Sequence, residues 1–166
     1  MILKKPLNFS EYNKNSPRLF KKEKLNLQKI GAREVHHVGS SAIPNMPGKG
    51  AIDILILSRT QEEKLKLKSK LILNGYTQGK SKERFRYFFW KIKDNQEYCI
   101  HLILSSNPIS KDQILFRDYI IQNPKEFEKY SKLKEINFKK SKGNRAKYRE
   151  LKQKYFQKIL NKICKN

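Results

Sequence analysis

The chain is organised around two segments, Val35-His36-His37-Val38-Gly39-Ser40-Ser41 and Ala51-Ile52-Asp53-Ile54-Leu55-Ile56-Leu57. They predict a short strand, a turn of small residues, and a second strand that carries one carboxylate. Gly39 tolerates backbone angles that other residues avoid, and it lets a ligand approach the main chain. Ser40 and Ser41 add hydroxyl groups to that turn. The alternative is that all three residues serve only the turn.

Asp53 is the most conspicuous single residue. A continuous apolar run such as 51–57 predicts a buried strand. A carboxylate inside such a run costs free energy unless it is paired or holds a metal ion. Asp53 is therefore either a functional residue or a structural carboxylate that loop amides satisfy. The loop between the two segments contains Pro and Gly residues and Lys49, which is either one of many lysines or a phosphate contact next to Asp53.

The composition indicates one domain over residues 1–166, with 37% hydrophobic residues and a net charge of +23. Such a charge attracts polyanions, with an affinity that falls as salt rises. The abundance of Lys, Asn and Ile also fits a compositional bias, which explains the charge without a partner.

The sequence favours a cytoplasmic protein with no membrane segment. No apolar stretch approaches the roughly 20 residues of a transmembrane helix, and the first residues lack the pattern of a signal peptide. Cys99 and Cys164 lack the spacing of a metal site, and we expect both to be free thiols.

Helices are predicted over residues 17–30, 60–73 and 110–122, from residue 124 to a break near 141–143, and from there to the C-terminus. Ser16, Thr60 and Ser110 are the expected N-caps. Residues 76–82 are predicted to be polar and mobile. The side chains expected to point inward are Phe20, Leu27, Ile30, Leu65, Leu67, Ile72, Leu115, Phe116, Tyr119, Ile120, Phe127, Tyr130, Leu133, Ile136, Tyr148, Leu151, Tyr155, Phe156, Ile159 and Ile163.

Four strands are predicted in one sheet, over residues 34–38, 51–57, 85–91 and 98–104. The last two form a hairpin around a turn at residues 93–96. Four consecutive aromatic residues, Tyr87 to Trp90, either pack in the core or stack on a base. A small mixed sheet followed by helices makes an α+β or α/β domain.

Several motifs together resemble those of a known family. Gly39-Ser40 followed after twelve residues by Asp53 resembles the signature of the nucleotidyltransferase superfamily. The string 37–44, with Lys49 and Ile52-Asp53-Ile54 after it, resembles the GrpB-like family within that superfamily. Further matching motifs are Gly75-Tyr76, Arg86-Tyr87-Phe88-Phe89, His101-Leu102, Phe116-Arg117-Asp118-Tyr119 and Asn123-Pro124.

The resemblance implies a nucleotidyltransferase-like mixed sheet with flanking helices and a helical C-terminal part. It implies that Asp53 lies in a cleft beside the Gly39-Ser40 turn, with His101 on an adjacent strand. In active superfamily members the turn holds a triphosphate, and carboxylates two residues apart on one strand bind Mg²⁺. Here the position two after Asp53 is Leu55. One Mg²⁺ held by Asp53, phosphates and water remains chemically reasonable.

Two functions follow from these observations. The first is a nucleoside triphosphate-binding protein with Mg²⁺ on Asp53, an enzyme or the relic of one, which transfers a nucleotidyl group to an unknown acceptor. Its catalytic candidates are Asp53 and His101, and its phosphate-binding candidates are Gly39, Ser40, Ser41, Lys49 and Arg86. A satisfied core histidine is the alternative for His101. The second function is a non-catalytic basic module that binds RNA or another polyanion. The oligomeric state does not follow from the sequence.

Overall fold

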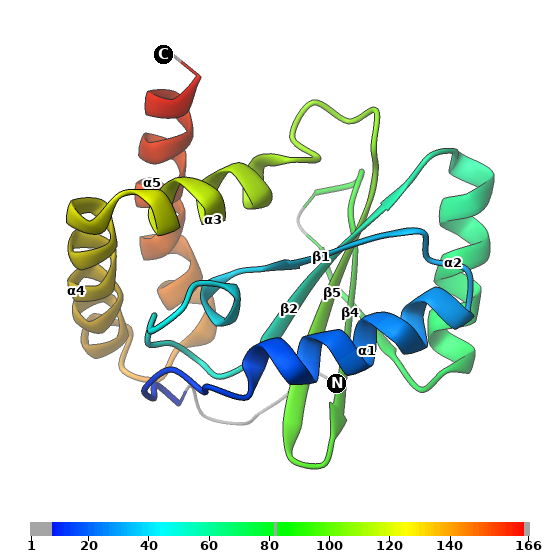
Figure 1. Ribbon diagram of the computed structural model, residues 1–166, viewed down its shortest axis with the longest axis horizontal. Coiled ribbons are helices and arrows are strands. Elements are labelled where there is room, and N and C mark those ends of the chain that lie inside the picture. The colour runs from blue at the N-terminus through cyan, green and yellow to red at the C-terminus, as the bar shows by residue number, and fades with distance from the viewer. Residues whose placement is uncertain (1–7, 82, 165–166) are drawn as a thin grey trace.

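A computed structural model describes residues 8–81 and 83–164 (Figure 1). Its centre is a five-stranded mixed sheet in the order β1-β2-β5-β4-β3. The strands are β1 (Glu34–Val38), β2 (Ile52–Ser58), β3 (Thr77–Gly79), β4 (Tyr87–Lys93) and β5 (Gln96–Leu104). The four predicted strands are confirmed, and they share one sheet.

The central strand pair β2 and β5 is parallel, whereas every other pair is antiparallel. The predicted hairpin joins β4 to β5, and Asp94 and Asn95 turn the chain with positive φ angles of 50° and 61°. Short polar side chains tolerate this conformation better than other residues with a Cβ. The prediction that residues 76–82 are polar and mobile is wrong for β3. This polar segment is a strand because its backbone pairs with β4, and its sequence has no apolar pattern that would predict a strand.

Five α-helices and one short 3₁₀ turn surround the sheet in the described ranges. They are α1 (Ser16–Lys29), η1 (Ser40–Ala42), α2 (Gln61–Leu73), α3 (Asp112–Gln122), α4 (Pro124–Ser141) and α5 (Arg145–Ile163). None of these helices is both long and apolar enough to cross a membrane. Thr60 caps α2 as predicted, but Ser16 and Ser110 cap nothing, because α1 and α3 begin after Asn15 and Lys111 without a side-chain cap.

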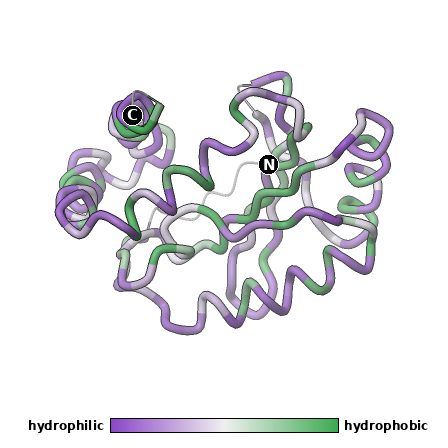
Figure 2. The backbone as a smooth tube through the Cα atoms, turned by 45° about the horizontal axis from the view of Figure 1, so that its top comes forward, coloured by the Kyte–Doolittle hydropathy of each residue, from purple (hydrophilic) through white to green (hydrophobic). Residues whose placement is uncertain are grey.

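The hydrophobic core of the described residues consists of three clusters, one on each face of the sheet and one among the C-terminal helices. Helices α1 and α2 cover one face, whose buried side chains include Leu27, Ile54 and Phe89. A smaller cluster on the opposite face includes Val38 and Leu55. Helices α3, α4 and α5 gather at one end of the molecule around a cluster of their own (Figure 1). Figure 2 shows the apolar colour concentrated in the strands and interrupted in the helices.

Four predicted inward positions are wrong, because these side chains are exposed: Leu65 (46%), Ile72 (47%), Leu115 (41%) and Ile136 (46%). The apolar spacing of α2 allowed more than one inward face, and the face that is buried carries Lys64 together with Leu67 and Leu71. Lys64, on α2, is buried and donates a 2.5 Å hydrogen bond to the carbonyl oxygen of Phe85. A lysine stem packs against apolar atoms when its amine finds an acceptor.

Candidate functional site

The turn after β1 packs directly on the carboxylate of β2. Gly39 has φ of 71°, and a Cβ built on it would lie 2.5 Å from Oδ2 of Asp53. Asp53 pairs with Val38 across the antiparallel strands, which brings the turn to this carboxylate. A side chain at position 39 would therefore displace Asp53, and glycine meets both the conformational and the steric requirement.

His101 lies on the neighbouring strand β5, with Nε2 3.9 Å from Oδ1 of Asp53. The Arg86 guanidinium lies 3.4 Å from the other ring nitrogen, Nδ1. Arginine only donates hydrogen bonds, so Nδ1 accepts and the imidazole proton sits on Nε2, facing Asp53. Burial lowers the pKa of His101, and the charge of Asp53 opposes this shift without reversing it. A neutral imidazole thus supports the carboxylate.

Positive charges converge on Asp53. Burial raises the pKa of Asp53, but His101, Lys49 and Lys152 outweigh it and hold the pKa well below its usual value. Lys152 lies on α5, far from Asp53 in sequence. Burial and the charge of Lys49 lower the pKa of Lys152 to about 8, although Asp53 opposes the shift. The site is an ionised carboxylate surrounded by amines.

A buried lysine of α4 fixes the loop before β2. Lys134 is 0% exposed, and its amine donates a hydrogen bond to the carbonyl oxygen of Pro47. Burial lowers the pKa of Lys134 well below its usual value. The next residue, Gly48, faces the Ser40 hydroxyl, which would lie 2.5 Å from a Cβ at position 48. The loop that carries Lys49 is therefore anchored to α4 and packed on the turn.

His37 and Arg117 hold the turn from the other side. Nε2 of His37 lies 3.0 Å from the hydroxyl of Ser41, and its ring stacks on Phe20 at 4.5 Å between centroids. Arg117 on α3 donates a 2.6 Å hydrogen bond to the carbonyl oxygen of His37. Ser41 is 6% exposed, so its hydroxyl serves the turn itself. Ser40 is the more accessible of the two predicted serines.

Two buried donors beside this site have no hydrogen-bond partner among residues 8–81 and 83–164. They are Nε of Arg86 and the hydroxyl of Tyr148. Burial and the charge of Asp53 raise the pKa of Tyr148, which keeps that phenol protonated as a donor. Buried donors are rarely left unpaired. Arg86 directly precedes β4 and Tyr148 lies on α5, so the sheet side and the helix side each present one unpaired donor.

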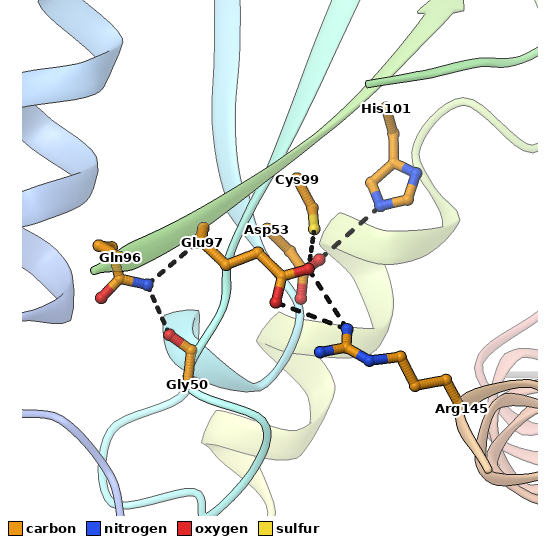
Figure 3. Close-up of polar contacts among 7 residues, drawn as sticks. All are labelled: Gly50, Asp53, Gln96, Glu97, Cys99, His101 and Arg145. Atoms are coloured by element: carbon orange, nitrogen blue, oxygen red, sulfur yellow. Dashed lines mark hydrogen bonds and ion pairs between the residues drawn. The ribbon is translucent and has the colours of Figure 1, made fainter. Parts of the chain in front are cut away.

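Glu97 and Cys99 extend the same face of β5 (Figure 3). The Cys99 thiol donates to Oε1 of Glu97 over 3.7 Å, and Arg145 on α5 donates to the same oxygen over 3.3 Å. Burial raises the pKa of Cys99, so this cysteine is a protonated thiol and not a metal ligand. Glu97 is an acidic neighbour that was not among the predicted site residues.

The donor set fits one metal ion at most. Within the described parts of the chain, no three or more His, Cys, Asp or Glu residues form a group that could hold a metal ion. Leu55 shares the face of Asp53, but it is 0% exposed and packs with Val38, Leu57 and Ile103. The position two residues after Asp53 is thus part of the hydrophobic core. Asp53, whose side chain is 17% exposed, can offer one carboxylate to a Mg²⁺ that takes its other ligands from phosphates and water.

The structure brings together five residues that the sequence predicts for the site: Gly39, Ser40, Lys49, Asp53 and His101. The sequence does not predict Lys134, Tyr148 and Lys152 as site residues. They come from helices remote in sequence, where each is one basic or aromatic residue among many. Two depressions, of about 260 and 530 Å³, lie elsewhere and contain none of these residues. The cleft expected at Asp53 stays a prediction.

Comparison with known proteins gives one family match and several relatives. The family described as GrpB protein matches residues 6–162. The UPF0157 protein YqkA of Bacillus subtilis is 33% identical over 127 residues, which are 74% of this chain but 37% of YqkA. The glutamate-rich protein GrpB of Alkalihalophilus pseudofirmus is 27% identical over 161 residues, 92% of each chain. A UPF0157 protein of Deinococcus radiodurans matches over 51% of its length, so two of these relatives are much longer than the matched region.

Solved structures show the same fold. The crystal structure of GrpB from Enterococcus faecalis superposes with a TM-score of 0.79 at 23% identity, covering 94% of this chain and 99% of that one. The Cid1 poly(U) polymerase bound to MgATP superposes with a TM-score of 0.50 at 13% identity, covering 77% of this chain and 46% of Cid1. The chain therefore has a nucleotidyltransferase-like fold.

Proposed function

Since this chain belongs to the GrpB family, whose match spans residues 6–162, we propose that its Asp53 site binds the phosphate groups of a nucleoside triphosphate. One observation carries the proposal. Around Asp53, the amines of Lys49 and Lys152 converge with two buried donors that lack partners, Nε of Arg86 and the Tyr148 hydroxyl. Phosphate oxygens carry negative charge and accept several hydrogen bonds, so they would neutralise the amines and also pair with the two donors.

Each residue then has a defined task. Ser40 and the backbone of the Gly39 turn contact phosphate oxygens, which glycine permits because it has no side chain. Lys49 and Lys152 neutralise the charge, and Arg86 binds a phosphate with its unpaired nitrogen. His101 keeps Asp53 oriented, because its Nε2 proton faces the carboxylate. His101 is thus a positioning residue in this account.

A single Mg²⁺ fits beside Asp53. Asp53 would hold it together with the ligand's phosphates, and the ion would neutralise phosphate charge and polarise a phosphoryl oxygen. Because Leu55 is buried in the core, this strand offers no second carboxylate for a pair of metal ions. We therefore propose nucleotide binding as the main function, and we expect any nucleotidyl transfer to be slow.

The test is a thermal-shift titration with ATP, GTP, UTP, CTP and inorganic tripolyphosphate, each with and without Mg²⁺. At a ligand concentration of about 100 times Kd, binding adds about 2.7 kcal/mol to stability. For a domain of this size that raises Tm by about 5–10 °C. Asp53→Asn keeps the shape of the side chain and removes its charge, so the Mg²⁺-dependent part of the shift should disappear while the fold survives.

Asp94→Asn is the matched control. Asp94 lies at the tip of the β4–β5 hairpin with φ of 50°, a conformation that asparagine accepts. It makes the same chemical change away from the site, so its nucleotide response should equal that of the wild type. If no triphosphate raises the Tm of the wild type, the proposal is wrong. If Asp53→Asn changes Tm but leaves the nucleotide response intact, Asp53 is only structural.

A second candidate function is supported by the charge of the C-terminal helices. Residues 125–165 contain fifteen Lys or Arg and four Glu. In this alternative the protein is a non-catalytic module that binds RNA or another polyanion through α4 and α5. Affinity for a single-stranded RNA should then fall steeply between about 50 and 200 mM salt. Asp53→Asn should leave that binding unchanged, which separates the two functions.

A further inference from the structure

Strand β4 divides its four aromatic residues between the two faces of the sheet. Alternate residues of a strand point to opposite faces. Phe89 is 0% exposed in the core under α1 and α2, and Tyr87 packs against the same core. Phe88 pairs with His101, and Trp90 pairs with Cys99. These two rings therefore lie on the face that carries Asp53.

Phe88 and Trp90 are not core residues. Both are only partly buried, and neither belongs to any of the three hydrophobic clusters formed by the described residues. The Phe88 ring lies 5.5 Å from the His101 ring at an angle of 40°. The two rings therefore offer partly accessible aromatic surface beside His101 and the other polar side chains of this face.

The adjacent strand leaves room for these rings. A Cβ on Gly79 of β3 would lie 2.7 Å from Cδ1 of Phe88 and 3.6 Å from Cδ1 of Trp90. Gly79 has no positive φ angle, so its backbone conformation does not require glycine. The packing requires glycine, because the Phe88 ring can lie over β3 only when position 79 has no side chain.

The distance between Asp53 and the rings is similar to the distance between the phosphates and the base of a nucleotide. Trp90, Cys99 and Asp53 form one row across β4, β5 and β2. Neighbouring strands are about 4.8 Å apart, so the backbone of Trp90 lies about 10 Å from that of Asp53. A ligand with phosphates at Asp53 can reach Trp90 with the group attached to its sugar.

We propose that Phe88 and Trp90 form a platform on which the base of the bound nucleotide stacks. This inference rests on the proposed function, since it places the phosphates at Asp53. The negatively charged phosphates of a nucleotide are attracted by Lys49 and Lys152, and its planar base can stack on the partly exposed rings. Stacking is tolerant of base identity, because every base has a π-face. The site should therefore discriminate nucleotides from inorganic phosphates more strongly than it discriminates one base from another.

Trp90 is the single tryptophan of the chain, so its fluorescence reports on the platform directly. We expect ATP to quench this fluorescence with saturation. Inorganic tripolyphosphate should raise Tm without quenching, and it should reverse the quenching by ATP in competition. ATP that raises Tm but leaves the fluorescence unchanged would overturn the platform and leave the proposed function intact. If neither compound binds, both proposals fail.

Variants separate stacking from general stability. Trp90→Ala and Phe88→Leu should weaken ATP binding relative to tripolyphosphate, for Trp90→Ala by about 5- to 150-fold. Trp90→Phe keeps an aromatic ring and should retain most of the affinity. Leu65→Ala is the control, because this exposed leucine lies on α2, which covers the other face. An unchanged ratio of ATP to tripolyphosphate affinity in Trp90→Ala would contradict the platform.

Discussion

Gly39 and Asp53 are packed so closely that a Cβ on Gly39 would lie 2.5 Å from Oδ2 of Asp53. The turn after β1 and the carboxylate of β2 therefore form one structural unit. This contact explains why a glycine precedes the serine pair, and it makes the turn sensitive to a single methyl group.

Gly39→Ala should lower the free energy of unfolding by more than about 2 kcal/mol, because it adds a clash with Asp53 to the strain of a positive φ. Gly75→Ala is the matched control: Gly75 has φ of 81°, and a Cβ there meets nothing within 4 Å. It should cost only about 1 kcal/mol. Urea denaturation measures both. Equal costs would show that the contact with Asp53 is unimportant.

Stability should fall in acid because of His37. Burial, aided by the charge of Arg117, lowers the pKa of His37 from 6.5 to about 4, although Asp53 opposes the shift. Between these pH values the unfolded chain binds more protons at this imidazole than the folded protein does, so stability rises with pH. The contribution of the neutral His37 to stability is therefore lost as pH falls from about 6.5 to 4.

His37→Gln should flatten that part of the pH profile, measured by urea denaturation at several pH values. The neighbouring His36 is the control, since its ring points to Glu34 at 3.1 Å and is 31% exposed. His36→Gln should keep the acid sensitivity of the wild type. If both variants behave like the wild type, another group causes the acid loss.

Lys152 illustrates a conflict between stability and binding. Its amine is charged near neutral pH and lies among other cations, so Lys152→Met should stabilise the ligand-free protein by about 1 kcal/mol. The same change should weaken ATP binding. Lys154→Met, an exposed neighbour on α5, should do neither. If Lys152→Met loses stability and keeps full affinity for ATP, Lys152 is not part of the binding site.

The pH dependence gives a second reading on Lys152. Its pKa is lowered from 10.5 to about 8 in the folded protein, so the unfolded chain binds more protons between these values. Stability of the wild type should therefore rise relative to Lys152→Met as pH increases from about 8 to 10.5. ATP affinity should fall over the lower part of that range as the amine loses its charge.

Leu55→Asp tests whether the missing carboxylate can be restored. Leu55 is 0% exposed within its apolar cluster, so an aspartate there would be buried without a partner. We expect a loss of more than about 4 kcal/mol and no gain in metal affinity. Leu73→Asp, at a position on α2 that is 84% exposed, should change stability by less than about 0.5 kcal/mol. A folded Leu55→Asp that binds Mg²⁺ more tightly would show that this part of the site is open.

Much of the sheet could be predicted from the sequence, because its central strands are continuous apolar runs. Asp53 stood out for the same reason, as the one charge in such a run. Strand β3 could not be predicted this way, since its polar residues form a strand only because β4 supplies the backbone partners. Helix boundaries were also close, but the inward face of α2 was not determined by its pattern of leucines and lysines.

The C-terminal contribution to the site was beyond sequence reasoning. Lys134 and Lys152 are two of the many lysines in α4 and α5, and only packing distinguishes them from their exposed neighbours. Lys134 can be buried because the Pro47 carbonyl oxygen accepts a hydrogen bond from its amine. The fold of α3, α4 and α5 against the turn therefore decides which lysines face Asp53, and the linear charge pattern does not.

The most direct test of the central claim is isothermal titration calorimetry of ATP with Mg²⁺ into the wild type, Asp53→Asn and Asp94→Asn. We expect saturable binding at one site in the wild type and in Asp94→Asn, with affinity that depends on Mg²⁺. In Asp53→Asn the Mg²⁺ dependence should be lost while the protein stays folded. Binding of equal affinity and equal Mg²⁺ dependence in all three proteins, or no binding in any of them, would contradict a nucleotide site at Asp53.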